Sequence, residues 1–160
     1  MEPISILSLA CNIVQLVSFA GDLLSKGFEI QQATNGSIVR NNELESVTRE
    51  LREFIYKLRT SPRETNPHNP VSQHTERSLQ ALCQNCIDVA TELVEALEKL
   101  KLRGNRNIWN SMRQALGCVW AEPKINTLSQ KLELYRRQID TVLLFSLRYA
   151  PMRIIHSDLS

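Results

Sequence analysis

Glycine and proline are scarce in this chain of 160 residues, which has five glycines and six prolines. Because these residues most often interrupt regular elements, their scarcity predicts long secondary structure. Runs of alternating β-branched residues bounded by turns are also absent from the sequence, which argues against a sheet. Apolar residues make up 42% and charged residues 22%, as in a globular domain and not a disordered chain.

Motifs for catalysis or for cofactor binding are missing as well. The sequence has neither a GxGxxG loop nor a Walker A motif, and its three histidines lie in or beside predicted loops. We therefore expect no enzyme and no cofactor. A net charge of +2 is too small to indicate nucleic acid, so no nucleic-acid partner is expected. An enzyme without a recognisable motif is a weaker hypothesis, and it would need ionisable side chains clustered in a deep pocket.

The four cysteines, Cys11, Cys83, Cys86 and Cys118, all fall within apolar-periodic stretches. The spacing Cys83-x-x-Cys86 occurs in redox and zinc sites. A redox pair would sit in a βαβ setting, and zinc would need two more ligands at a recognised spacing. We interpret both cysteines as core residues of a reduced, cytoplasmic protein, with no metal site.

The N-terminal segment carries no charge from Pro3 to Gly21. A secretory signal would have a basic start, but only Glu2 precedes the apolar run. A thin polar stripe recurs every three or four residues, at Ser5, Ser8, Asn12, Gln15, Ser18 and Asp22. This pattern predicts a largely buried bundle helix, and the alternative is a helix that can also enter a membrane or a partner.

Apolar periodicity divides the chain into five predicted helices. We expect them over Ile4–Gln32, Val39–Arg59, Ser72–Arg103, Asn107–Trp120 and Pro123–Arg148. A turn is expected at Asn35–Ser37, a loop at Ser61–Pro70, a stop at Gly104, and a helix end before Pro151. The predicted fold is all-α, a single antiparallel bundle of four to five helices over residues 1–149, followed by an irregular tail over residues 150–160.

A basic stretch lies between Glu98 and Glu122, where no acidic residue occurs. It contains Trp109 and Trp120 and five cations, Lys99, Lys101, Arg103, Arg106 and Arg113. One interpretation is a helix end with charge that compensates the dipole and with both tryptophans in the core. The others are a surface for an acidic protein or anionic lipid, and a contact to nucleic acid.

Several segments together resemble the N-terminal domains of fungal NACHT-type STAND (NLR-like) receptors, in order and spacing from about Met1 to Arg148. They are Met1–Ser5, Leu9–Gln15, Leu23–Lys26, Leu79–Cys86, Leu97–Lys101 and Trp109–Trp120. The chain looks like a member of the HeLo-like group, whose domains are helical bundles placed ahead of a nucleotide-binding oligomerisation module.

The resemblance implies a signalling or effector domain in regulated cell death, that is, in heterokaryon incompatibility or innate-immune-like defence. In relatives, self-association releases an apolar N-terminal helix that attacks the membrane. Carried onto this chain, the membrane-active candidates are Ile6, Leu9, Ile13, Leu16, Val17 and Phe19. The accessory contacts to anionic lipid would be Lys101, Arg103, Arg106 and Arg113.

The implied partners are a second copy of the chain, anionic lipid, and an upstream or downstream signalling protein. The protein would be cytoplasmic and would move to a membrane on activation. The alternative function is a helical adaptor for protein–protein interaction that has no membrane activity.

Overall fold

The computed structural model describes residues 3–25, 36–61, 70–103 and 111–157. The elements of this part are helices, which confirms the predicted all-α class. They are α1 (Pro3–Leu24), α2 (Gly36–Thr60), α3 (Pro70–Arg103), the short α4 (Met112–Leu116) and α5 (Glu122–Ser157).

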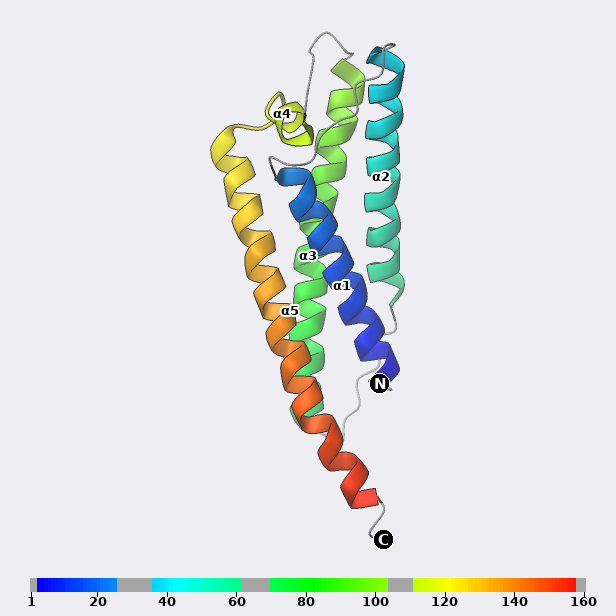
Figure 1. Cartoon of the computed structure of the whole chain (residues 1–160), viewed down its shortest axis with the longest axis vertical. Coiled ribbons are helices and arrows are strands. Elements are labelled where there is room, and N and C mark those ends of the chain that lie inside the picture. The colour runs from blue at the N-terminus through cyan, green and yellow to red at the C-terminus, as the bar shows by residue number, and fades with distance from the viewer. Residues whose placement is uncertain (1–2, 26–35, 62–69, 104–110, 158–160) are drawn as a thin grey trace.

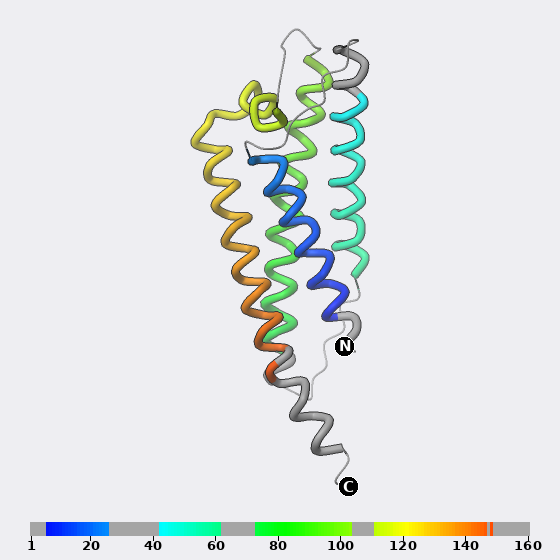
Figure 2. Tube along the Cα trace, viewed as in Figure 1, coloured from blue at the N-terminus to red at the C-terminus, as the bar shows by residue number. Residues whose placement is uncertain are grey.

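The four long helices run up, down, up and down, so that neighbours in sequence are antiparallel and α1 runs parallel to α3 (Figure 1). The same path is visible in the tube trace, where α2 and α5 lie on opposite sides of α1 and α3 (Figure 2). Helix α1 contacts α2, α3, α4 and α5. The predicted single antiparallel bundle is therefore confirmed, and α1 and α3 are its two central helices, each in contact with all the others.

One face of α1 forms part of the hydrophobic core. Leu9, Ile13, Leu16 and Val17 are at most 4% exposed, and Ala20, Leu23 and Leu24 continue this face. The predicted polar stripe lies on the other side, since Ser8, Gln15, Ser18 and Asp22 are exposed and Asn12 is half-buried. The side chain of Ser5 lies outside the described residues. A helix with a single charge, Asp22, can therefore be central because its few polar groups share one face.

The other long helices contribute apolar seams to the same core. In α2 the seam is Leu44, Val47, Leu51, Ile55 and Leu58, and in α5 it is Ile125, Leu128, Leu132 and Ile139. The ring of Phe19 in α1 packs against the ring of Phe54 in α2, with 5.7 Å between the two ring centroids. Steps of three and four residues bring each seam to one face, as the periodicity predicted.

The sequence predicted the existence of the helices more accurately than it predicted where they begin and end. α1 ends at Leu24 and not at Gln32, and residues 26–32 lie outside the described part. α2 starts at Gly36, so the turn expected over Gly36–Ser37 is helical. α4 covers only five of the residues expected over Asn107–Trp120, and residues 117–119 form a turn. Gly104 lies outside the described part.

The largest error concerns Pro151, which was expected to end the last helix and begin an irregular tail. Helix α5 instead continues through Pro151 to Ser157. Proline lacks an N–H group and disfavours the helical conformation of the residue before it, which is why a stop was predicted. It removes one backbone hydrogen bond, whereas the following residues still have N–H groups to donate. The expected tail over residues 150–160 is therefore wrong up to Ser157.

The central position of α1 predicts a difference between two leucines of the same helix. Leu16 has no exposed surface, whereas Leu7 is 55% exposed. Replacing Leu16 with alanine should lower the free energy of unfolding by about 2–5 kcal/mol, since the cavity adds to the lost transfer energy. Leu7→Ala should change it by no more than about 0.5 kcal/mol. Urea unfolding followed by circular dichroism checks both values, and equal effects would contradict a core role for α1.

Candidate functional site

The six candidates for a membrane-active helix all lie on α1, on its inward side. Leu9, Ile13, Leu16 and Val17 are buried, while Ile6 and Phe19 are partly buried and pack against the core. In this conformation the apolar face therefore contacts α2, α3 and α5. A role of these side chains at a membrane would require α1 to leave the bundle.

Helix α1 also meets the requirements of a membrane span in length and composition. Within the described residues it is the one helix that does so, over the 19 residues Ile6–Leu24. Its solvent-facing side carries Leu7, Cys11, Gln15, Ser18 and Asp22. Only Asp22, near the C-terminal end, has a charge. Core helices of globular proteins can satisfy the same criteria, so the property is necessary for spanning but not sufficient.

Arg113 holds the C-terminal end of α1. Its Nη1 donates a hydrogen bond to the backbone carbonyl oxygen of Leu24 at 2.7 Å. Its Nη2 donates to Oδ1 of Asn126 at 2.7 Å and is ion-paired with Glu122. The last four carbonyls of a helix lack partners within the helix, and a cation at this end is favourable. One guanidinium thus joins α1, α4 and α5, and we call this set of contacts the Arg113 clasp.

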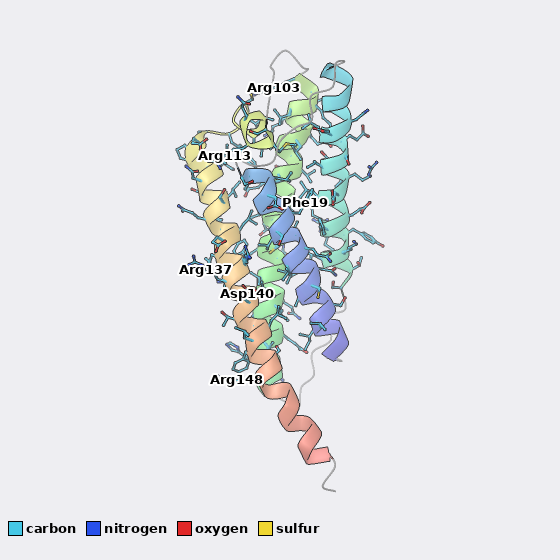
Figure 3. The ribbon with its side chains drawn as sticks, viewed as in Figure 1. Phe19, Arg103, Arg113, Arg137, Asp140 and Arg148 are labelled. Carbon is cyan, nitrogen blue, oxygen red and sulfur yellow. The ribbon has the colours of Figure 1, made fainter. Side chains whose placement is uncertain are left out.

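Helix α4 positions Arg113 by burying the residues around it. Ser111 caps the helix by accepting a hydrogen bond from the backbone N–H of Gln114 at 3.2 Å. Met112, Ala115 and Leu116 have no exposed surface, and α4 contacts both α1 and α3. Figure 3 shows Arg113 near the end of α1, where α5 begins. The short helix thus closes one end of the bundle and fixes the guanidinium there.

The predicted basic surface is therefore wrong for Arg113, whose side chain is only 15% exposed. Lys101 lies 3.5 Å from Oε1 of Glu98, and Arg103 donates to the carbonyl oxygen of Cys118 at 2.8 Å. Arg106 lies outside the described residues. The two acids that bound the acid-free stretch, Glu98 and Glu122, are thus the ion-pair partners of two of its cations. The Arg113–Glu122 pair joins α4 to α5, whereas Lys101 and Glu98 are three residues apart on α3.

The structure describes one of the two tryptophans of this stretch. Trp120 is half-buried and packs against the core, with Nζ of Lys124 at 5.2 Å from its ring centroid. Lys124 also pairs with Glu92 of α3 at 2.8 Å. Trp109 lies outside the described residues. The packing of Trp120 against the core favours the interpretation of this stretch as a helix end with its tryptophans in the core.

The two cysteines of the Cys-x-x-Cys spacing are both core residues, as predicted. Cys83 and Cys86 are 3% and 1% exposed, and Sγ of Cys83 lies 3.6 Å from the carbonyl oxygen of Leu58, to which it donates. Burial and then the neighbouring Cys83 raise the pKa of Cys86 from an ordinary value of 9.0 to about 12. Cys86 is therefore a protonated thiol at neutral pH, and a protonated thiol is a poor nucleophile.

Surface hollows offer little enclosure for chemistry. A hollow of about 540 Å³ over the outer side of α2 is open to solvent and is lined by side chains of both charge signs. Among the described residues, no group of three or more histidine, cysteine, aspartate or glutamate side chains is placed to hold a metal ion. His74 is exposed, and the side chains of His68 and His156 lie outside the described part.

Comparisons of the whole chain with protein-family models, with curated proteins and with solved structures gave no match. The features of the described structure that bear on function are α1 and the Arg113 clasp. Sequence reasoning found α1 but missed the clasp, because Leu24, Arg113, Glu122 and Asn126 share no motif. The available signal was Glu122 itself, the acid that ends the acid-free stretch just before a predicted helix.

Arg113→Met should destabilise the protein more than the same change at an exposed arginine. Hydrogen bonds to charged groups contribute roughly 1.5–3 kcal/mol, but Glu122 is 61% exposed and its share is screened. We expect the free energy of unfolding to fall by about 1–3 kcal/mol. Arg137→Met, which breaks an exposed pair with Glu133, should cost less than about 1 kcal/mol. Denaturant unfolding measures both, and equal losses would contradict the clasp.

The raised pKa of Cys86 predicts a loss of stability in alkali. Below pH 9 the thiol is protonated in both the folded and the unfolded chain, so it adds no pH dependence. Between pH 9 and pH 12 the unfolded chain loses the proton while the folded chain keeps it, and the free energy of unfolding therefore falls. This fall should be smaller in Cys86→Ala, measured by urea unfolding at several pH values. Rapid alkylation of Cys86 in the native protein at pH 9 would contradict the assignment.

Proposed function

We propose that this chain is a signalling domain of the HeLo-like type, which self-associates and then acts on membranes through α1 in regulated cell death. The observation that carries the proposal is the double character of α1. It is a central helix of the bundle, and it is also a charge-poor helix of membrane-spanning length. The resting protein would be cytoplasmic.

The apolar face of α1 is suited to two environments. In the bundle, fully buried side chains such as Ile13, Leu16 and Leu23 pack among the other helices. In a bilayer, the same side chains would contact lipid, and the opposite side would bring only uncharged groups and the terminal Asp22. Few charges would have to enter the hydrocarbon, where each one near the helix centre costs roughly 2.5–3.5 kcal/mol.

Release of α1 uncovers the apolar seams of α2, α3 and α5. Each fully buried large side chain contributes roughly 1.5–3 kcal/mol, so a monomer would not release α1 on its own. Self-association would cover the exposed seams and shift the balance between the two states. Release also breaks the hydrogen bond from Arg113 to the carbonyl of Leu24, which makes the Arg113 clasp part of the barrier.

The alternative function is an adaptor that binds a signalling protein or a second copy and never contacts lipid. The observation that favours it is the depth at which α1 is buried. Ile13, Leu16 and Leu23 have no exposed surface, and α1 contacts each of the other described helices. In an adaptor these contacts would be permanent.

A charge on the exposed side of α1 separates the two functions. Gln15 is exposed and lies near the middle of the candidate span, so Gln15→Lys should leave the folded bundle within about 0.5 kcal/mol of wild type. An inserted helix would carry the new charge near its centre and would be strongly disfavoured. We expect wild type to release dye from anionic liposomes and Gln15→Lys to lose most of this leakage.

The matched control is Ser46→Lys, a new lysine at an exposed position of α2, which should leak like wild type. Equal leakage by Gln15→Lys and wild type would show that α1 does not cross the bilayer. No leakage by wild type, even when a fused coiled coil forces it to oligomerise, would favour the adaptor.

A further inference from the structure

The side of α5 that faces away from the bundle carries a second line of regularly spaced residues. Helix α5 lies at one edge of the bundle, opposite α2, so this side faces solvent (Figure 1). Alternating steps of three and four residues are the spacing of a and d positions in a coiled coil, and they place side chains in one line. We call this line the outer seam of α5, and its six exposed residues are Gln130, Leu134, Arg137, Thr141, Leu144 and Arg148.

The apolar part of the outer seam consists of two leucines. Leu134 and Leu144 are 51% and 69% exposed. A single exposed leucine is common in soluble proteins and needs no explanation, but these two share one seam. They lie roughly 15 Å apart along the helix, at a rise of about 1.5 Å per residue. Phe145 lies beside the seam, but it already interacts within the chain and is not part of the seam.

The charges of the outer seam and its flank are balanced in sign. Arg137 and Arg148 lie in the seam, and the exposed acids Glu133 and Asp140 lie along one flank of it. Arg137 is 3.4 Å from Glu133, but both side chains are largely exposed, so this pair is weak. Among the described residues, no ion pair involves Asp140 or Arg148. Two cations beside two anions do not match a surface of one charge sign, such as an anionic bilayer.

We propose that the outer seam of α5 pairs with the outer seam of a second copy of this chain. The two α5 helices would be antiparallel, related by a two-fold axis half-way between Leu134 and Leu144. In such a pair, positions equally distant from the axis in sequence lie opposite each other. Leu134 of each copy therefore packs against Leu144 of the other, and the two exposed apolar groups of each seam are covered.

The same register brings opposite charges together. Arg137 lies within one residue of the position opposite Asp140 of the other copy, so two arginines and two aspartates alternate around the axis. Arg148 lies within three residues of the position opposite Glu133, which is within reach of its long side chain. Figure 3 shows Arg137, Asp140 and Arg148 along α5. A parallel pair would instead place each arginine against itself. Charge complementarity thus selects a second copy in the antiparallel orientation.

This pairing deepens the proposed function and rests on it, because it names the contact by which the domain self-associates. The outer seam is exposed while α1 is still packed in the bundle, so pairing does not require release of α1. With two leucines from each copy, the contact is small compared with a standard protein interface. The domain would therefore be monomeric at low concentration and would pair when several copies are held close together.

The first test exchanges charges in the whole chain and measures self-association by sedimentation velocity over a range of concentrations. Arg137→Glu alone and Asp140→Lys alone each place like charges together and should weaken association about tenfold or more. An equal mixture of the two variants should associate again, because each reversed charge then lies beside the other reversed charge. Arg49→Glu and Glu53→Lys reverse exposed charges of α2 and should have no effect.

The second test removes the apolar contact. Leu134→Ser combined with Leu144→Ser should weaken self-association about tenfold or more. The matched control is Tyr56→Ser combined with Leu102→Ser, which replaces side chains that are 69% and 87% exposed on α2 and α3 and should have no effect. All variants change exposed positions, and circular dichroism checks that each is folded.

The register is tested by disulfide cross-linking between Leu134→Cys and Leu144→Cys. Both variants also carry Cys11→Ser and Cys118→Ser, which remove the two native cysteines that are not buried. A mixture should form cross-linked dimers on mild oxidation. Either variant alone should not, because its two new thiols lie roughly 15 Å out of register, too far for a disulfide. Cross-linking of Leu134→Cys with itself would show a parallel pair and overturn the proposed register.

Three further results would overturn the pairing. The first is a wild type that stays monomeric at every concentration up to about 1 mM. The second is a dimer that neither the charge variants nor the leucine variant weakens. The third is a monomeric wild type whose binding to phosphatidylserine vesicles is lost in the leucine variant, which would assign the seam to lipid.

Failure of the pairing and failure of the proposed function give different results. A dimer that the seam variants abolish, in a protein that never releases dye from liposomes, would keep the pairing and reject the action on membranes. Dye release that Gln15→Lys abolishes, in a protein whose self-association ignores the seam variants, would keep the proposed function and reject the outer seam alone.

Discussion

The burial of α1 is the constraint on which the rest of the structure depends. A helix with almost no charge has no stable place on a water-exposed surface, so its apolar face must be covered on several sides. Contacts with α2, α3, α4 and α5 provide that cover in the up-down-up-down arrangement of the four long helices. The thin polar stripe through Gln15 and Ser18 gives α1 its one exposed side. The near absence of charge in α1 is therefore the reason for its central position.

The Arg113 clasp adds polar specificity to this apolar arrangement. Apolar packing alone allows helices to slide, whereas the hydrogen bond to Leu24 and the contacts to Glu122 and Asn126 fix the end of α1 against α4 and α5. The clasp also buries most of the Arg113 side chain, which would otherwise be a surface cation. The acid-free stretch thus contributes contacts between helices through Arg113.

Core packing and bilayer insertion make the same demand on a helix, which is that nearly all of its surface be apolar. In the proposed mechanism, the choice between them depends on the free-energy difference between a packed and a released α1. Apolar contacts and the Arg113 clasp favour the packed state, while self-association and a nearby membrane favour release.

The sequence by itself determined the helices, their inward faces and the core role of Cys83 and Cys86, because steps of three and four residues are a local property of each segment. It did not determine where α1 and α4 end, or that α5 continues through Pro151, because helix ends depend on small differences that tertiary contacts override. Nor did it reveal that Arg113 points inward. A guanidinium is solvent-exposed or buried depending on which carbonyls and carboxylates surround it. Leu24 and Glu122 contact Arg113 only in the folded bundle. Periodicity therefore specified the elements, and long-range contacts decided which charges remained on the surface.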